Sequence, residues 1–174
     1  MGADVHMYVE YNSKERLPHA NPAFNSWRSF GDRINPGRNY NLFGLLAGVR
    51  CEGEIFAVRG LPENLGWSAN GDSTLYITES GDDDGCCTLG QAESYEKWGS
   101  TIHKDANGKP TKVDHPDWHS HSWLTVDELQ QVFDAYFTKH GQNVGVEYRA
   151  LLSAMRALEN EGKNDVRVVF WFDN

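Results

Sequence analysis

The sequence has few cysteines, no long apolar run and no basic cluster, and each absence excludes a class of protein. Its three cysteines, Cys51, Cys86 and Cys87, form no Cys-x-x-Cys pair, which argues against a disulfide framework and a cysteine-rich zinc site. No apolar stretch approaches the roughly 20 residues of a membrane span, and no basic segment precedes an apolar one at the N-terminus. We therefore expect a cytoplasmic protein with no membrane partner.

The charge balance narrows the choice of partner. Acidic residues outnumber basic ones, and the net charge is −9 at pH 7. Proteins that bind long nucleic acids present a basic face to the phosphates, so we expect no such partner here. A small anionic ligand remains compatible with this composition, because a few arginines can form a local positive pocket on an acidic surface.

Several catalytic motifs are also missing. The glycines do not show the spacing of a phosphate-binding loop, and no Gly-x-Ser-x-Gly nucleophile motif is present. The acidic run at residues 82–84 lacks the rest of a twelve-residue calcium loop. Function must therefore be sought in other polar residues.

Two segments have the pattern of β-strands. Residues 4–11 alternate, which predicts a strand with one apolar face and one face that is solvated or functional. Residues 166–172 are almost continuously apolar and β-prone, which predicts a central strand buried on both faces. A third, short strand is expected around Trp27 within residues 25–30.

Helix signals follow in three places. Asn39 precedes a short apolar stripe at residues 40–48. Thr125 and Glu128 form a capping box before a helix that ends near Gly141, and residues 146–161 have helical apolar spacing. With 39% apolar residues in 174, we predict a single α+β domain over residues 1–174, with a central mixed sheet that contains the N- and C-terminal strands and two longer helices on one face.

Residues 65–117 are the least regular part of the sequence. A stretch of this length inside a compact domain is usually an insertion, a binding loop or a lid. We expect a loop-rich insertion, with a hairpin that pairs residues 73–78 with residues 86–89.

Two short motifs could supply a metal site. Asp4 and His6 leave one face of the first strand about 7 Å apart, and His119 and His121 share a face if their segment is extended. These four residues are the predicted catalytic residues and ligands of a divalent metal such as Zn, Mn or Mg, with an open coordination position. The alternatives are that Asp4 and His6 only hydrogen-bond at the strand start, and that the second motif is a polar loop.

Arginines and neighbouring polar residues could bind an anion. Arg38 precedes a helix N-terminus, where free N–H groups favour negative charge, and a guanidinium suits a phosphate. The predicted ligand-binding residues are Arg38, Asn39, Tyr40, Arg50, Arg59, Ser120, Ser122 and Trp123. For any single arginine, a surface or ion-pairing role is the competing interpretation. Asp173 and Asn174 follow the last strand, where ligand sites often lie, although a frayed acidic terminus would look the same.

These motifs resemble a family of uncharacterised proteins encoded mainly by bacteriophages and prophages. The similarity rests on the opening Met-Gly-x-Asp-Val-His, on Gly37-Arg38-Asn39-Tyr40 and Arg59-Gly60-Leu61-Pro62, and on the segment from His119 to Thr125. Many members open with Met-Gly-Cys-Asp-Ile-His; this chain has Ala3 in place of the cysteine and a longer segment between Pro62 and His119. The resemblance implies a phage origin, a host-cytoplasmic setting and a shared polar set, which comprises Asp4, His6, Arg38, Arg50, Arg59, His119 and His121.

Three functions are consistent with these features. The leading hypothesis is a metal-dependent hydrolase of a small phosphorylated molecule, such as a nucleotide immune signal of the host, in which the metal activates a water and the arginines bind phosphate. Its rival is a homo-oligomeric sponge that sequesters such a signal without turnover and stacks a base on Trp67, Trp98, Trp118 or Trp123. The third is an inhibitor that binds a host protein through its acidic surface and exposed tryptophans.

Overall fold

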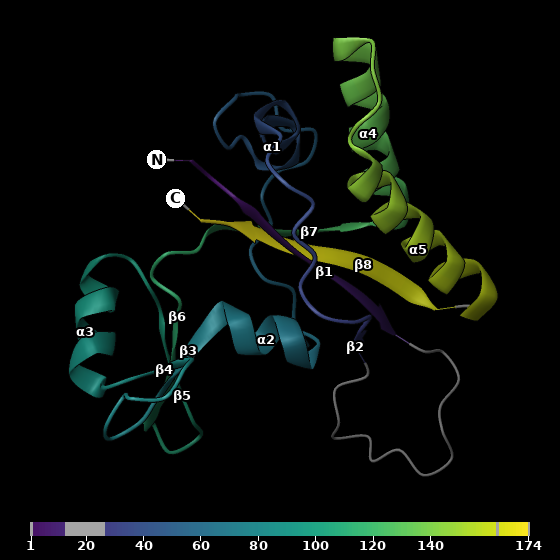
Figure 1. The fold of residues 1–174 in the computed structure, drawn as a ribbon. Helices are drawn as coiled ribbons and strands as arrows, with labels where there is room; N and C mark the ends of the chain where they lie inside the picture. The colour runs from purple at the N-terminus through teal and green to yellow at the C-terminus, as the bar shows by residue number, and fades with distance from the viewer. Residues whose placement is uncertain (1, 13–26, 163, 174) are drawn as a thin grey trace. The chain divides into compact units, whose positions relative to one another are not determined.

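The computed structural model describes residues 2–12, 27–162 and 164–173. Within them the chain forms five helices and two four-stranded sheets (Figure 1), which confirms the α+β prediction. The contacts divide the chain into two compact units, one formed by Met1–Gly66 with His119–Asn174 and the other by Trp67–Trp118. The second unit coincides closely with the expected insertion at residues 65–117.

The sheet of the first unit contains both terminal strands. It has the order β2-β1-β8-β7 and consists of β1 (Val5–Asn12), β2 (Trp27–Ser29), β7 (His119–Thr125) and β8 (Asp165–Phe172). All described pairs in it are antiparallel, so the expectation of a mixed sheet is wrong for this sheet. Two helices, α4 (Val126–His140) and α5 (Val146–Gly162), separate β7 from β8. After two helices the chain enters β8 in the direction opposite to β7, whereas a single connecting helix would give a parallel pair.

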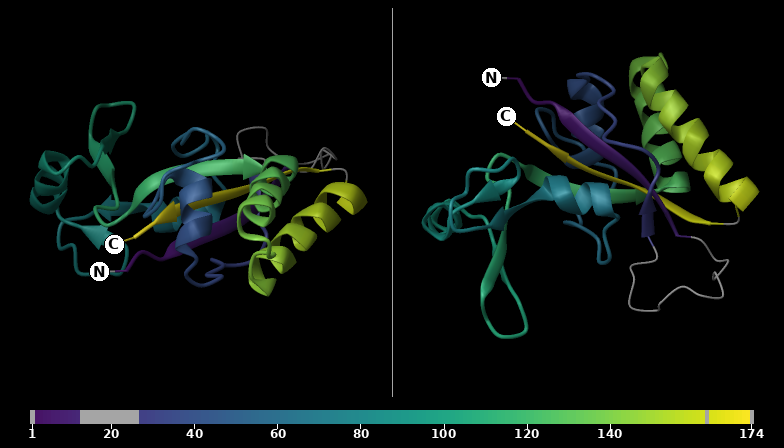
Figure 2. Two further views of the ribbon diagram at one scale, coloured as in Figure 1. Left: turned by 90° about the horizontal axis from the view of Figure 1, so that it is seen from above. Right: turned by 60° about the horizontal axis from the view of Figure 1, so that its bottom comes forward.

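Three helices supply the core on one face of this sheet. They are α1 (Tyr40–Ala47), α4 (Val126–His140) and α5 (Val146–Gly162), and their apolar residues pack against Val5, Met7 and Val9 of β1. Figure 2 shows α4 and α5 as a pair beside the strands. The predicted helix signals are confirmed: Asn39 caps α1, Thr125 and Glu128 form the capping box of α4, and Gly141 ends α4 in a left-handed conformation.

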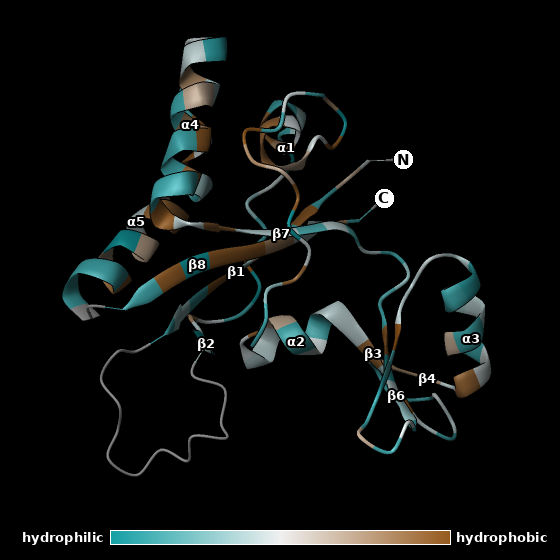
Figure 3. Ribbon diagram, turned by 180° about the vertical axis from the view of Figure 1, so that it is seen from behind, coloured by the Kyte–Doolittle hydropathy of each residue, from teal (hydrophilic) through white to brown (hydrophobic). Residues whose placement is uncertain are grey.

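The opposite face of β1 is buried, so of the two expected alternatives, a solvated or a functional face, the solvated one is wrong. His6, Tyr8 and Glu10 are 5%, 1% and 0% exposed. Alternation identifies the two faces of a strand but cannot tell what covers the second one. Part of this cover is the segment that ends at Gly66, whose N–H donates to Glu10 at 2.7 Å. Strand β8 is buried from Val166 onward, as predicted, and most of it is hydrophobic in Figure 3.

The second unit is folded rather than irregular. It contains α2 (Trp67–Ser73), β3 (Thr74–Ile77), β4 (Cys86–Cys87), α3 (Leu89–Lys97), β5 (Ile102–Lys104) and β6 (Pro110–Asp114), with the strand order β4-β3-β6-β5. Cys87, Ala92 and Val113 form its small core.

The expected hairpin inside the second unit is wrong, because β3 and β4 are parallel, with Tyr76 opposite Cys86. The chain reverses twice between the two strands. Gly81 N–H donates to the Thr78 hydroxyl at 3.0 Å in the first reversal, and Cys86 N–H donates to Asp83 O at 3.0 Å in the second. Two reversals restore the original strand direction.

No helix in the described part of the chain is both long enough and apolar enough to span a bilayer.

Candidate functional site

Asp173, just after β8, is hydrogen-bonded to Asp4, just before β1. The Asp4 N–H donates to Asp173 Oδ1 at 2.9 Å, and the Asp173 N–H donates to Asp4 O at 3.2 Å. Asp173 Oδ2 lies 2.8 Å from His6 Nε2. One carboxylate therefore extends the pairing of the two strands and also fixes the orientation of the His6 imidazole. Asn174, the other candidate at this terminus, lies outside the described residues.

The carboxylate of Asp4 holds the side chain of Arg38 in place. The Arg38 Nε and Nη2 donate to Asp4 Oδ1 and Oδ2 at 2.6 and 2.8 Å. The hydrogen bonds from Arg38 lower the pKa of Asp4, and the same pairing raises the pKa of Arg38. Both carboxylate oxygens of Asp4 are thus engaged, while the Arg38 side chain remains 54% exposed. In this arrangement Asp4 orients a guanidinium.

Gly2 explains part of the opening motif. A Cβ atom at this position would clash with the guanidinium of Arg38 and would lie 3.1 Å from the Tyr40 hydroxyl. Glycine at this position therefore leaves room for the observed placement of the Arg38 guanidinium, which a larger residue would displace. We call Gly2, Asp4, His6, Arg38, Tyr40 and Asp173 the strand-end cluster.

Asn39, a predicted ligand-binding residue, has a structural role between Arg38 and Tyr40. Its Oδ1 accepts from the Leu42 N–H at 3.1 Å and its Nδ2 donates to the Tyr136 hydroxyl at 3.3 Å. The N-cap fixes the start of α1 and so places its two neighbours at the end of the sheet.

The two histidines of β7 do not share a face. His119 is opposite Phe172 and Ser122 is opposite Phe170, so β7 contains one extra residue, and Ser120 adopts a positive φ of 54°. Such a bulge shifts the alternation of side chains. The His119 ring lies 6.1 Å from the Phe172 ring, whereas the His121 ring lies 5.6 Å from the Trp171 ring, centroid to centroid. The prediction of a shared face is therefore wrong.

The four predicted metal ligands are not gathered into one site. Among the residues that the structure describes, no group of three or more His, Cys, Asp or Glu side chains could hold a metal ion. Asp4 and His6 do lie at one end of the sheet, but Asp4 is hydrogen-bonded to Arg38 and His6 to Asp173. Metal binding by Asp4, His6, His119 and His121 stays a prediction.

Arg59 belongs to a second polar cluster, with a different carboxylate. Its guanidinium donates to both oxygens of Glu128, at 2.9 and 2.5 Å, and lies 4.7 Å from the ring centroid of Trp123. The Arg59 N–H also donates to the buried Ser122 hydroxyl at 3.2 Å. Arg59 therefore connects its loop to β7 and α4. This is the ion-pairing role that was the competing interpretation for each arginine. Arg50 is exposed and has a positive φ of 64°.

We expect the Arg59–Glu128 pair to make folding pH-dependent. The hydrogen bond from Arg59 lowers the pKa of Glu128 below its usual 4.5, so the folded state holds this proton less tightly than the unfolded state. Its contribution is present above about pH 4.5 and is lost as the pH falls further. Glu128→Gln should cost about 1 kcal/mol of unfolding free energy at pH 7, since the pair is partly exposed.

Urea unfolding at pH 7 and at pH 3 measures this effect. The difference between the wild type and Glu128→Gln should shrink at pH 3, and an equal difference at both pH values would contradict the assignment. Asp127→Asn is a matched control in the same helical turn, because Asp127 is exposed.

The predicted base-stacking tryptophans have different environments. Trp67 and Trp98 are each 86% exposed. The Trp118 indole N–H donates to Asp72 O at 2.7 Å, and its ring stacks on His115. Trp123 lies against Arg59. Of these four, Trp67 and Trp98 therefore retain most of their surface for a partner.

Sequence reasoning missed one buried ion pair. Arg167 Nε donates to Glu10 Oε2 at 2.8 Å, and the two side chains are 6% and 0% exposed. A signal was present, because an arginine inside an apolar strand that is buried on both faces needs a partner.

No protein-family model, curated protein or solved structure matches this chain. Its fold and candidate site define an α+β protein in which the end of an antiparallel sheet holds an exposed, oriented arginine.

Proposed function

We propose that this protein binds a small anionic molecule at the strand-end cluster, and that phosphorylated molecules such as nucleotides are the first class to test. The observation that carries the proposal is the guanidinium of Arg38, whose side chain is 54% exposed and which two hydrogen bonds to Asp4 hold in place. An oriented guanidinium can donate its remaining N–H groups to a phosphate or carboxylate with little further loss of side-chain entropy.

Two neighbours of Arg38 add to this donor set. The Tyr40 side chain is 39% exposed, and its hydroxyl is close to the same backbone position at Gly2. Helix α1 starts at Tyr40 with no acidic residue in its first turn, so its dipole favours an anion there. Because Asp4 offsets the charge of Arg38, we expect recognition to depend on directed hydrogen bonds more than on net charge.

The contacts of Asp4 and His6 support binding without turnover over metal-dependent hydrolysis. Asp4 uses both oxygens to hold Arg38, and Asp173 holds His6. If the phage origin implied by the sequence resemblance holds, the protein would sequester a nucleotide signal of host defence.

Hydrolysis is the second candidate, and the His6–Asp173 pair is the observation that favours it. An aspartate that fixes an imidazole is the arrangement that general bases use. The 2.8 Å contact between Asp173 Oδ2 and His6 Nε2 has this form. His6 is only 5% exposed and its Nδ1 is buried, so a substrate would reach this imidazole only after local rearrangement.

Calorimetric titration with inorganic phosphate and a panel of nucleotides tests the proposal. Arg38→Gln should weaken binding of the best ligand about tenfold, a loss typical of one charged hydrogen-bonding group. Arg33→Gln, another exposed arginine, is the matched control and should bind like the wild type. Unaltered affinity in Arg38→Gln, or no binding to any ligand in the panel, would refute the proposed site.

A second measurement separates binding from hydrolysis. The protein is incubated with the bound nucleotide, with and without added divalent metal, and the mixture is resolved by chromatography while metal content is measured. Intact nucleotide recovered after denaturation supports sequestration. Product formed at catalytic protein levels, and abolished in His121→Ala, would instead support the hydrolase with its predicted metal ligands.

A further inference from the structure

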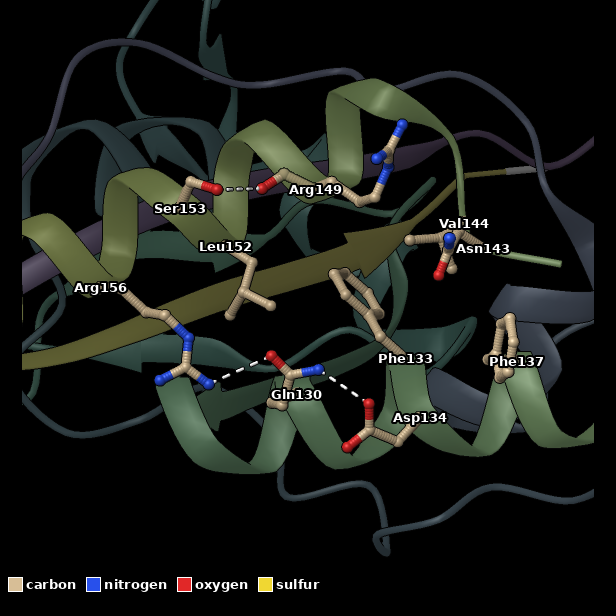
Figure 4. Close-up of a pocket in the computed structure, with 10 residues that line it drawn as sticks. All are labelled: Gln130, Phe133, Asp134, Phe137, Asn143, Val144, Arg149, Leu152, Ser153 and Arg156. Atoms are coloured by element: carbon tan, nitrogen blue, oxygen red, sulfur yellow. Dashed lines mark hydrogen bonds between the residues drawn. The ribbon is translucent and has the colours of Figure 1, made fainter.

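A groove runs between α4 and α5, away from the strand-end cluster residues, and has a volume of about 500 Å³. Figure 4 shows side chains from both helices and from the connecting turn around it. Cavities of roughly 300–1,000 Å³ accommodate most small-molecule ligands. The groove is therefore large enough for a compact organic molecule.

The floor of the groove is apolar. Phe133 and Leu152 are each 7% exposed and Val144 is 4% exposed, and all three line the groove. Phe137 borders it as well and remains 51% exposed. An apolar floor beside an exposed aromatic ring favours a ligand with a ring or a short hydrocarbon body.

The walls of the groove carry two arginines. Arg156 donates to the Gln130 amide oxygen at 3.1 Å, and Gln130 in turn donates to Asp134 at 2.8 Å. Within the described residues, neither Arg149 nor Arg156 forms an ion pair with a carboxylate. In a chain of net charge −9, two guanidinium groups without a carboxylate partner beside one cavity favour an anion.

We infer that this groove is a second ligand site, and that it binds a monoanionic organic molecule with an apolar ring. The two arginines and Asp134 leave the lining with a small excess of positive charge, so one negative group is favoured over several. The apolar body lies on Phe133 and Leu152, and the anionic group accepts hydrogen bonds from Arg149 or Arg156. This inference is independent of the function proposed for the strand-end cluster.

Titration of the ¹⁵N-labelled full chain with naphthalene-1-sulfonate, followed by amide NMR shifts, tests the inference. For a probe of this size we expect a Kd of about 1 mM. Saturable shifts should be centred on the groove-lining residues of α4 and α5. Naphthalene-1,5-disulfonate and neutral 1-naphthol should each bind at least about threefold more weakly.

Variants of the full chain locate the contacts. Arg149→Gln with Arg156→Gln should weaken binding about fivefold or more, and Ser153→Phe should block the groove; far-UV circular dichroism checks that each variant is folded. Arg33→Gln should bind the probe like the wild type, and the position of the shifts, on the groove-lining residues or on the strand-end cluster, separates the two sites. Shifts centred elsewhere, shifts that do not saturate, or wild-type affinity in the double arginine variant would overturn the inference.

Discussion

Replacing Arg167 with methionine should destabilise the protein by about 3–5 kcal/mol, the usual cost of removing one partner from a buried ion pair. Arg167 bonds Glu10 at 2.7 and 2.8 Å and donates to Asn64 O at 3.0 Å. Its guanidinium also lies 3.7 Å from the ring centroid of Trp27. The Glu10 carboxylate is fully buried. Among its described contacts, the donor that would remain without Arg167 is the Gly66 N–H.

Urea unfolding at pH 7 measures this loss, and the double variant Glu10→Met/Arg167→Met tests its cause. If the penalty comes from an uncompensated charge, the double variant should be at least about 2 kcal/mol more stable than Arg167→Met. Arg28→Met is the matched control on an exposed arginine. A double variant as unstable as the single one would show that lost packing, and not charge, causes the effect.

Lowering the pH should partly rescue Arg167→Met. Burial already raises the pKa of Glu10, against the hydrogen bonds from Arg167 and Gly66, and removal of Arg167 should raise it further. The folded variant would then bind this proton more tightly than the unfolded chain. Its deficit relative to the wild type should therefore shrink as the pH falls toward 5.

The helices could be predicted from sequence because their signals are local. Asn39 accepts from Leu42 three residues away, and the Thr125–Glu128 capping box spans the same distance. Such contacts depend on adjacent sequence, so the pattern alone identifies them. The two central strands of the first sheet, β1 and β8, were also predictable, since alternation and continuous apolar character are local as well.

The candidate site was only partly predictable, because its contacts join distant parts of the chain. Asp4 and His6 were correctly placed near the start of the first strand, where Asp4 directly precedes β1, but the partner of His6 is Asp173, which is 167 residues away. The extra residue at Ser120 depends on how β7 registers against β8. No signal within the His119–Ser122 segment reveals that register, and so the alternation there predicted the wrong face for one histidine.

Gly44 provides a second case in which tertiary contact should reverse a local preference. In the interior of α1, alanine would ordinarily be more favourable than glycine by about 1 kcal/mol. Here a Cβ atom at residue 44 would lie 2.7 Å from both the Cβ and the carbonyl oxygen of Cys51. Backbone cannot move aside as a flexible side chain can, so we expect Gly44→Ala to destabilise the protein by about 1–3 kcal/mol.

Gly71→Ala is the matched control for this prediction. Gly71 lies in helix α2, and nothing is within 4 Å of the Cβ position there. Its replacement should therefore follow helix propensity and stabilise by about 0.5–1 kcal/mol. Thermal unfolding of both variants compares the signs directly. A higher melting temperature for Gly44→Ala, like that expected for Gly71→Ala, would contradict the close contact between α1 and Cys51. The segment that leads from α1 toward Arg59 would then be held less firmly than this contact implies.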